Sequence, residues 1–153
     1  EAKKEIEKLI QTVNTAVNQL IDSKNIAASF KNRLTEKDKT TYEHQIKLCE
    51  EITKKADSLI DLYLGKVDKR QGITKSSDVS VMQRIGTANW YASSRPNGLT
   101  TTEKTLINQS KMRLEEVLVA TNKFFALDWL NYQTELEKIN LSPFKEIKIF
   151  KTN

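Results

Sequence analysis

The sequence predicts an all-α protein, folded as an antiparallel up-down four-helix bundle with a short third helix that follows a long loop. Three observations favour this class. Glycine and proline number only 4 and 2 in 153 residues, whereas a fold rich in strands needs many such residues at its turns. Apolar residues recur every three or four positions over long stretches, which places them on one side of a helix. A single domain of this length can bury a core of its own.

The first two helices are expected over about residues 2–34 and 36–64. In the first, the apolar stripe starts at Ile6 and reaches Leu34; in the second, it starts at Tyr42 and reaches Tyr63. The second helix is expected to end at Gly65, because glycine can adopt the left-handed conformation that closes a helix. Only a short polar stretch separates the two helices, so they are expected to run antiparallel.

The third and fourth helices are expected over about residues 79–94 and 101–140, before a tail over 141–153. Residues 66–78 lack helical periodicity and are expected to form a loop, with Ser77 or Asp78 capping the third helix. Thr100 and Glu103 have capping-box spacing and predict the start of the fourth. The loop and the third helix together are long enough to return along the bundle between the second and fourth helices.

The charge pattern predicts a solvated surface. The chain has 25 basic and 20 acidic residues, interleaved, for a net charge of +5, which is not the basic track that a nucleic-acid partner requires. No apolar run approaches the roughly 20 residues of a membrane span, so no membrane insertion is predicted. The chain opens at Glu1 inside a helical pattern, and we expect it to be a piece of a longer protein. The pattern leaves the oligomeric state open.

The sequence predicts no catalytic residue, cofactor or metal site. Cys49 lies on the apolar stripe of the second helix and is expected to be a buried structural thiol. His44, the only histidine, is expected on or near the surface and not as a proton carrier. Asp57 and Asp61 lie one helical turn apart, but the Glu-x-x-His pairs typical of metal-binding bundles are missing from the sequence. A role as an enzyme is therefore not predicted for this chain.

Two segments form a candidate interaction surface. Segment 90–95 places two aromatic rings beside an arginine at the end of a helix, and these residue types are enriched in interface hot spots. Alternatively, both rings cap the hydrophobic end of the bundle. Loop 69–74 combines basic residues with a glycine and an isoleucine, which suits either a packed loop or a binding loop. The residues proposed for the surface are Trp90, Tyr91, Arg95, Arg70, Gln71 and Ile73.

Three strings in the sequence carry a resemblance to a known family. They are Lys-Arg-Gln-Gly-Ile-Thr at 69–74, the stretch 84–98 from Arg-Ile-Gly-Thr-Ala to Ser-Arg-Pro-Asn-Gly, and the stretch 122–129 from Asn-Lys-Phe-Phe to Trp129. Over about residues 60–145 the chain resembles the C-terminal helical region of bacterial sortilin-like proteins, whose main part is a β-propeller of Asp-box (BNR) repeats, labelled glycosyl hydrolase or sialidase-like. The resemblance implies an extracytoplasmic location, periplasmic or secreted. The chain itself has no Asp-box repeats, so no glycosidase residue is carried over to it.

Two functional hypotheses follow from these features. The first is a non-catalytic accessory domain that packs on the propeller of its own chain or on another protein. The second is an extracytoplasmic sensory bundle that binds a small ligand between its helices.

Overall fold

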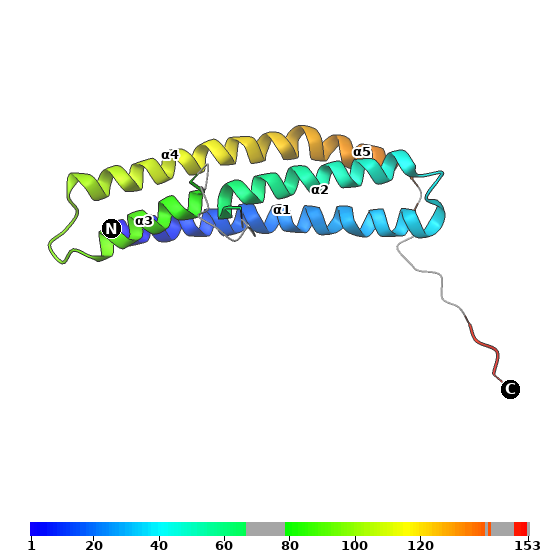
Figure 1. Cartoon of the computed structure of the whole chain (residues 1–153), viewed down its shortest axis with the longest axis horizontal. Helices are drawn as coiled ribbons and strands as arrows, with labels where there is room; N and C mark the ends of the chain where they lie inside the picture. Colours follow the sequence, from blue (N-terminus) through cyan, green and yellow to red (C-terminus); the bar gives the residue numbers. More distant parts are fainter. Residues whose placement is uncertain (67–78, 140, 142–148, 153) are drawn as a thin grey trace, which may run out of the picture.

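The computed structural model describes residues 1–66, 79–139, 141 and 149–152. Within these residues the chain forms helices and no strand, so the prediction of an all-α helical bundle is confirmed. Figure 1 shows an elongated bundle of nearly parallel and antiparallel rods. In chain order the elements are α1 (Ala2–Asp38), α2 (Glu43–Leu64), α3 (Val81–Ser93), α4 (Thr101–Lys123), the π-helix η1 (Phe124–Trp129) and α5 (Leu130–Glu137).

A tight turn after Asp38 reverses the chain between α1 and α2. The Asp38 carboxylate accepts hydrogen bonds from the backbone N–H groups of Thr40 and Thr41, at 3.1 and 3.2 Å. These bonds hold the pKa of Asp38 below its ordinary value, with the Thr41 hydroxyl as the largest cause. Helix α1 runs four residues past its expected end at residue 34, because glutamate and lysine extend an exposed helix end readily.

Two ion pairs between α1 and α2 are consistent with their antiparallel arrangement. Lys24 lies 2.6 Å from Asp57, and Lys31 lies 3.0 Å from Glu50. The lysine that comes later in α1 therefore meets the carboxylate that comes earlier in α2, as only antiparallel helices allow. These pairs are exposed to solvent and contribute little to stability, so packing between the two helices must supply most of it.

The course of α3 differs from the expected return along the bundle. A side-chain carbon at Gly65, which ends α2, would lie 3.5 Å from the Ser80 hydroxyl at the start of α3, so α3 begins beside the end of α2. Figure 1 shows α3 continuing in the direction of α2, alongside the N-terminal part of α1. The expectation that the third helix returns along the bundle is therefore wrong. Instead, α2 and α3 run in the same direction and together form one interrupted rod. Helical periodicity identifies each helix but does not fix its direction after a connection of this length.

The start of α3 and the start of α4 are both fixed by capping boxes. Ser80 accepts from the backbone N–H of Gln83, whose side chain accepts in return from the Ser80 N–H. The cap is thus Ser80 and not the expected Ser77 or Asp78, which lie outside the described residues. At α4 the predicted box of Thr100 and Glu103 is confirmed. Such caps satisfy amide donors that the first helical turn leaves unpaired.

The last rod is continuous from Thr101 to Glu137, but it contains a π-helix that the sequence analysis did not predict. From α4 to the first residue of η1, buried residues recur every seven positions through Glu103, Ser110, Val117 and Phe124, and through Ile107, Leu114 and Thr121. Continuing these repeats would place polar Asp128 and Asn131 in the core. The π-helix shifts the buried face by one residue, so Tyr132 is buried in place of Asn131, and Trp129 packs half-buried against the core in place of Asp128.

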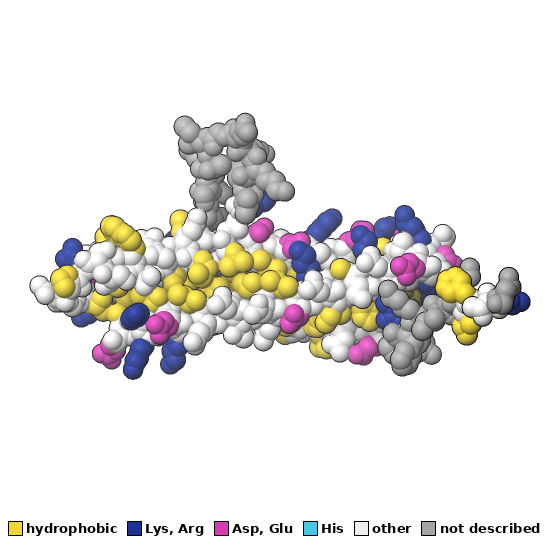
Figure 2. Space-filling model, turned by 90° about the horizontal axis from the view of Figure 1, so that it is seen from below, with side chains coloured by type: hydrophobic (Ala, Val, Ile, Leu, Met, Phe, Trp, Pro, Cys, Tyr) yellow, Lys and Arg dark blue, Asp and Glu magenta, His cyan; other side chains and the backbone are white. Residues whose placement is uncertain are grey.

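The core lies between the three rods, along their whole length. In α1 the buried residues Ile6, Val13, Leu20, Ala27 and Leu34 are spaced by seven. In α2, Cys49, Ala56 and Tyr63 have the same spacing. A seven-residue repeat keeps one side of each helix facing its neighbours along the whole bundle. On the outside, Figure 2 shows basic and acidic side chains scattered together along the visible face, with no single-sign track.

Candidate interaction surfaces

Trp90 and Tyr91 both lie on the surface near the C-terminal end of α3. Trp90 is 64% exposed and Tyr91 is 39% exposed, so neither ring is buried in the end of the bundle. Their ring centroids are 4.9 Å apart and the planes are nearly perpendicular, at 89°. This edge-to-face contact is the favoured geometry for two aromatic rings, and it restricts how the exposed indole can turn.

Arg95 has a partner within the chain. Its Nε atom lies 3.2 Å from Glu103 Oε1, and the Glu103 side chain is buried although the arginine is exposed. The other Glu103 oxygen accepts hydrogen bonds from the hydroxyl and the backbone N–H of Thr100. The hydroxyl bond is the largest cause that lowers the pKa of Glu103, and Arg95 adds to it. Arg95 therefore fastens the turn between α3 and α4 and is only partly free to meet a partner.

The remaining candidates, Arg70, Gln71 and Ile73, lie outside the described residues. The predicted convergence of loop 69–74 with the end of α3 thus stays a prediction. Within the described chain, Trp90, Tyr91 and Arg95 do share one end of the bundle, where α3 turns into α4.

The outward side of α3 carries a shallow hollow that the sequence analysis missed. We call it the α3 face; it has a volume of about 630 Å³ and is lined by Val79, Gln83, Gly86, Thr87 and Trp90. A side-chain carbon added at Gly86 would meet no atom within 4 Å, so the helix backbone is bare there. Val79 and Trp90, exposed by 47% and 64%, stand at its two ends. Within α3, the spacing of three and four residues from Gln83 through Gly86 to Trp90 is the signal in the sequence that marks one helical face, and Val79 lies just before the N-cap of this helix.

A second hollow, the α1–α5 groove, lies where these two helices separate. α1 and α5 make no backbone contact in the described residues, and the space between them is about 620 Å³. Its apolar wall includes Ile26 and Phe30 from α1 and Trp129, Tyr132 and Leu136 from the last rod. Arg33, Gln133 and Glu137 supply the polar groups. By periodicity alone, the apolar residues of the last rod belong to the core stripe, because periodicity does not reveal where neighbouring helices diverge.

The single cysteine, Cys49, is buried behind Tyr132, which lines the groove. The Tyr132 hydroxyl lies 3.4 Å from Cys49 Sγ, and both side chains are buried. Burial is the main cause that raises the pKa of the Cys49 thiol and of the Tyr132 phenol. A thiol held in its neutral form is a poor nucleophile, so the geometry assigns Cys49 to packing.

The described residues show no grouping of side chains suited to metal binding. No three His, Cys, Asp or Glu residues among them come together as ligands. His44 is exposed near the start of α2. In the same part of the chain, no helix is both long and apolar enough to span a bilayer.

Comparison with known proteins identifies no relative. No protein-family model matches the chain, and neither a curated protein nor a solved structure is significantly similar to it. A function must therefore be inferred from the surfaces of the molecule itself.

Proposed function

We propose that this chain is a non-catalytic helical interaction domain that docks on a protein surface through the α3 face. The observation that carries the proposal is the pairing of a largely exposed tryptophan with a bare backbone at Gly86 on the same side of α3. Tryptophan is the residue type most enriched in interface hot spots. A glycine on a helix face allows a partner's backbone or side chains to approach closely. The two features together suit a protein surface that covers Trp90.

The resemblance of stretches 69–74, 84–98 and 122–129 to the helical region of sortilin-like proteins supports a choice of partner. On this proposal the partner is the β-propeller of the same longer chain, or another protein, in an extracytoplasmic compartment. Stretch 84–98 contains Gly86, Thr87 and Trp90, so the string that carries the resemblance also contains three of the five residues of the α3 face.

The experiment is a binding measurement between this domain and the separately produced propeller portion of the parent chain. Trp90→Ala and Gly86→Gln are each expected to weaken binding by tenfold or more, which corresponds to about 1.4 kcal/mol or more. Trp90→Ala removes the exposed anchor, and Gly86→Gln fills the hollow. Because Trp90 is largely exposed and a side chain at position 86 would meet no atom of the domain, the far-UV circular dichroism of both variants should match that of the unmodified domain.

A matched control is Leu130→Ala, which removes a side chain of similar exposure, 55%, from the last rod. It is expected to leave binding to the propeller unchanged. Equal binding by the unmodified domain, Trp90→Ala and Gly86→Gln would remove the α3 face from consideration. Tyr91→Ala completes the series, since the tyrosine edge fixes the orientation of the indole, and we expect a smaller loss from it.

The α1–α5 groove supports a second candidate function, the binding of a small ligand between helices. Its volume of about 620 Å³ lies within the range of small-molecule sites, which are mostly apolar with a few polar groups. The Glu137 carboxylate already accepts a hydrogen bond from Gln133, at 2.9 Å, so Arg33 is the charged group left to bind a ligand with an apolar body and an anionic group. The probe we suggest is anilinonaphthalene sulfonate, which has this chemistry.

Trp129 reports on occupancy of the groove. The chain has two tryptophans, so Trp90→Phe leaves Trp129 as the only donor for energy transfer to the bound dye. Saturable binding of one dye per chain, weakened by Phe30→Ala and by Arg33→Gln, is expected if the groove is a site. Unsaturable dye binding that neither substitution alters would exclude it.

A further inference from the structure

The outer side of the last rod carries a row of exposed residues opposite its core-facing side. We call this row the α4 seam: Met112, Glu116, Val119, Lys123 and Leu127. At about 100° per residue, the four members within α4 lie nearly half a turn around the helix from the buried residues Leu114 and Thr121. Leu127 follows in η1. Met112, Val119 and Leu127 are exposed by 60%, 64% and 54%.

The spacing of the seam is that of an interhelical contact. Its members follow one another at intervals of four, three, four and four residues, the same pattern as the buried stripes of the bundle. Isolated apolar residues are common on surfaces and need no partner. Three large ones in a single helical row, separated by one acidic and one basic residue, call for a more specific explanation.

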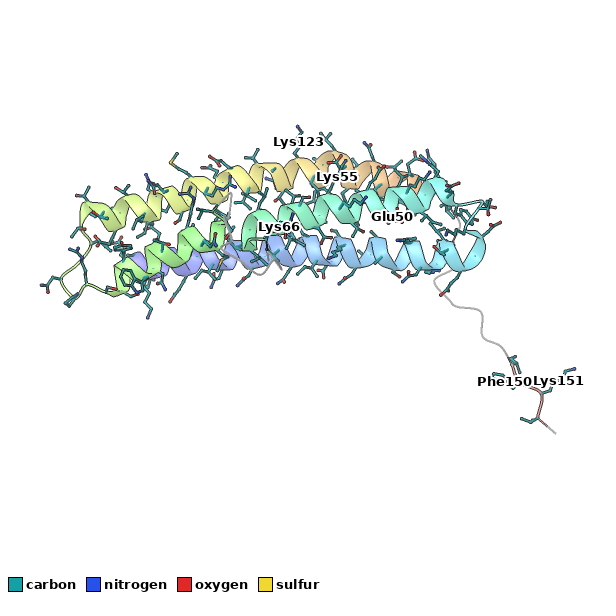
Figure 3. All side chains as sticks on the ribbon, viewed as in Figure 1. Glu50, Lys55, Lys66, Lys123, Phe150 and Lys151 are labelled. Atoms are coloured by element: carbon teal, nitrogen blue, oxygen red, sulfur yellow. The ribbon has the colours of Figure 1, made fainter. Side chains whose placement is uncertain are left out.

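The two charges of the seam are available to a partner. Figure 3 shows Lys123 projecting outward from the last rod, away from the other helices. The Glu116 side chain is 65% exposed and pairs with Arg113 on its own helix, at 3.0 Å. A pair of residues three apart on one helix is weak, and the Glu116 carboxylate is mostly exposed, so it can also accept a second cation.

The seam on one copy is complementary to the seam on a second copy that runs in the opposite direction. Glu116 lies three residues before Val119, and Lys123 lies three residues after Ala120; Met112 lies seven before Val119, and Leu127 seven after Ala120. If a second rod is laid antiparallel with its centre between residues 119 and 120, Glu116 meets the other copy's lysine and Met112 meets the other copy's leucine. A parallel arrangement would instead set like charges against each other.

We propose that the α4 seam is a self-association surface, on which a second copy of this chain packs antiparallel about a two-fold axis next to Val119. An isologous contact of this kind uses the same patch on both copies. It contains two Glu116–Lys123 pairs and three layers of apolar contact. Since only one rod of each copy takes part, the buried area is at the low end for specific interfaces, and the dimer forms with weak affinity. The seam adjoins the α3 face, since Val79 lines a hollow together with Met112 and Glu116. It does not include Trp90, so the inference goes beyond the proposed docking function.

The first test is sedimentation equilibrium of the unmodified chain and of charge variants. The mass of one chain is 17.6 kDa, and the weight-average mass is expected to rise toward twice that value as the concentration approaches about 1 mM. Glu116→Lys and Lys123→Glu should each weaken dimerisation by about tenfold, since each reversal places two repulsive pairs in the contact. The double variant, Glu116→Lys with Lys123→Glu, should restore it to within about threefold, because the charges then pair again.

Controls separate this contact from net charge and from the proposed docking function. Asp22→Lys makes the same charge change as Glu116→Lys on the solvent side of α1 and should leave dimerisation unchanged. Trp90→Ala should also have no effect, so loss of propeller binding and loss of self-association are distinguishable. A single-chain mass at every concentration, or a double variant that stays as weak as the single ones, would overturn the proposal.

Cross-linking tests the direction of packing. Cys49 is buried, so an engineered cysteine is the accessible thiol. In the antiparallel arrangement, Val119→Cys lies about 1.5 Å along the axis from its mate, whereas Met112→Cys lies about 22 Å from its own. A short bismaleimide should therefore join two copies of Val119→Cys and not two copies of Met112→Cys. Efficient joining of both variants would indicate a parallel pair and refute the proposed register.

Discussion

A buried hydrogen bond between α2 and α4 offers a quantitative test of how these two helices are held together. The Tyr63 side chain is fully buried, and its hydroxyl lies 2.7 Å from Thr121 Oγ1. The Thr121 hydroxyl in turn donates to the backbone carbonyl of Val117, at 2.8 Å. Because the threonine proton is used in that bond, Tyr63 must be the donor to Thr121. Burial raises the pKa of Tyr63, so the phenol keeps its proton at neutral pH.

The two partners are therefore expected to respond unequally to substitution. Tyr63→Phe removes the donor but leaves Thr121 bonded to Val117, so the free energy of unfolding should fall by about 1 kcal/mol. Thr121→Val leaves the tyrosine hydroxyl buried without this acceptor and should cost about 2 kcal/mol. In the double variant both polar groups are gone, so its cost should fall short of the sum of the two by about 1 kcal/mol.

The measurement is urea unfolding followed by far-UV circular dichroism on all four proteins. The thermal midpoints should fall in the same order, and each kcal/mol of destabilisation should lower the midpoint by about 2–4 °C in a chain of this size. The reasoning is refuted if the effects of the two single substitutions add in the double variant, or if Tyr63→Phe is the more damaging. A change in the slope of the unfolding free energy against urea concentration would instead indicate altered compactness of the unfolded chain.

Three further outcomes are expected from backbone and capping positions. Gly65→Ala should destabilise the fold by about 2 kcal/mol, because φ is +91° and ψ is 151° there, a region that is almost restricted to glycine; an unchanged urea midpoint would contradict this. Gly86→Ala should stabilise it by up to about 1 kcal/mol, since the added carbon meets no atom and alanine favours the helix; a lower midpoint would argue against open space. Glu103→Gln should destabilise the fold at pH 7, and the gap from the unmodified chain should close as the pH falls toward about 3. The lowered pKa of Glu103 gives stability that is present at neutral pH and lost as the carboxylate is protonated, so a gap independent of pH would refute the role of its charge.

Local signals in the sequence predicted the helices and several of their ends. Gly65 ends α2, as expected, and Thr100 with Glu103 starts α4. These features depend on a few neighbouring residues, so they can be read without knowing the rest of the fold. The π-helix also leaves a trace: the seven-residue repeat of buried positions in α4 resumes at Tyr132, one residue late. That trace has meaning only once the repeat is known to face a core.

The candidate surface was predicted less completely, because exposure depends on which helices lie next to one another. Trp90 and Tyr91 were assigned either to an interface or to the end of the core, and the structure leaves both exposed. The salt bridge from Arg95 to buried Glu103 could not be anticipated. It joins the turn before α4 to the first turn of α4, and Glu103 was expected only to cap that helix. The α1–α5 groove likewise exists only because two helices diverge.

The sequence by itself determined which segments are helical and which side of each is apolar, because these properties follow from residue type and from a spacing set by the helix repeat. The tertiary structure decided the direction of α3, the shift of the buried face at η1, and which apolar residues remain on the surface as the α3 face, the groove and the α4 seam. The physical reason is that an apolar side chain becomes buried only where a second element packs against it. A helix with apolar residues on two sides can cover only the side that a neighbour reaches, and the choice of neighbour is made by the packing of the whole chain.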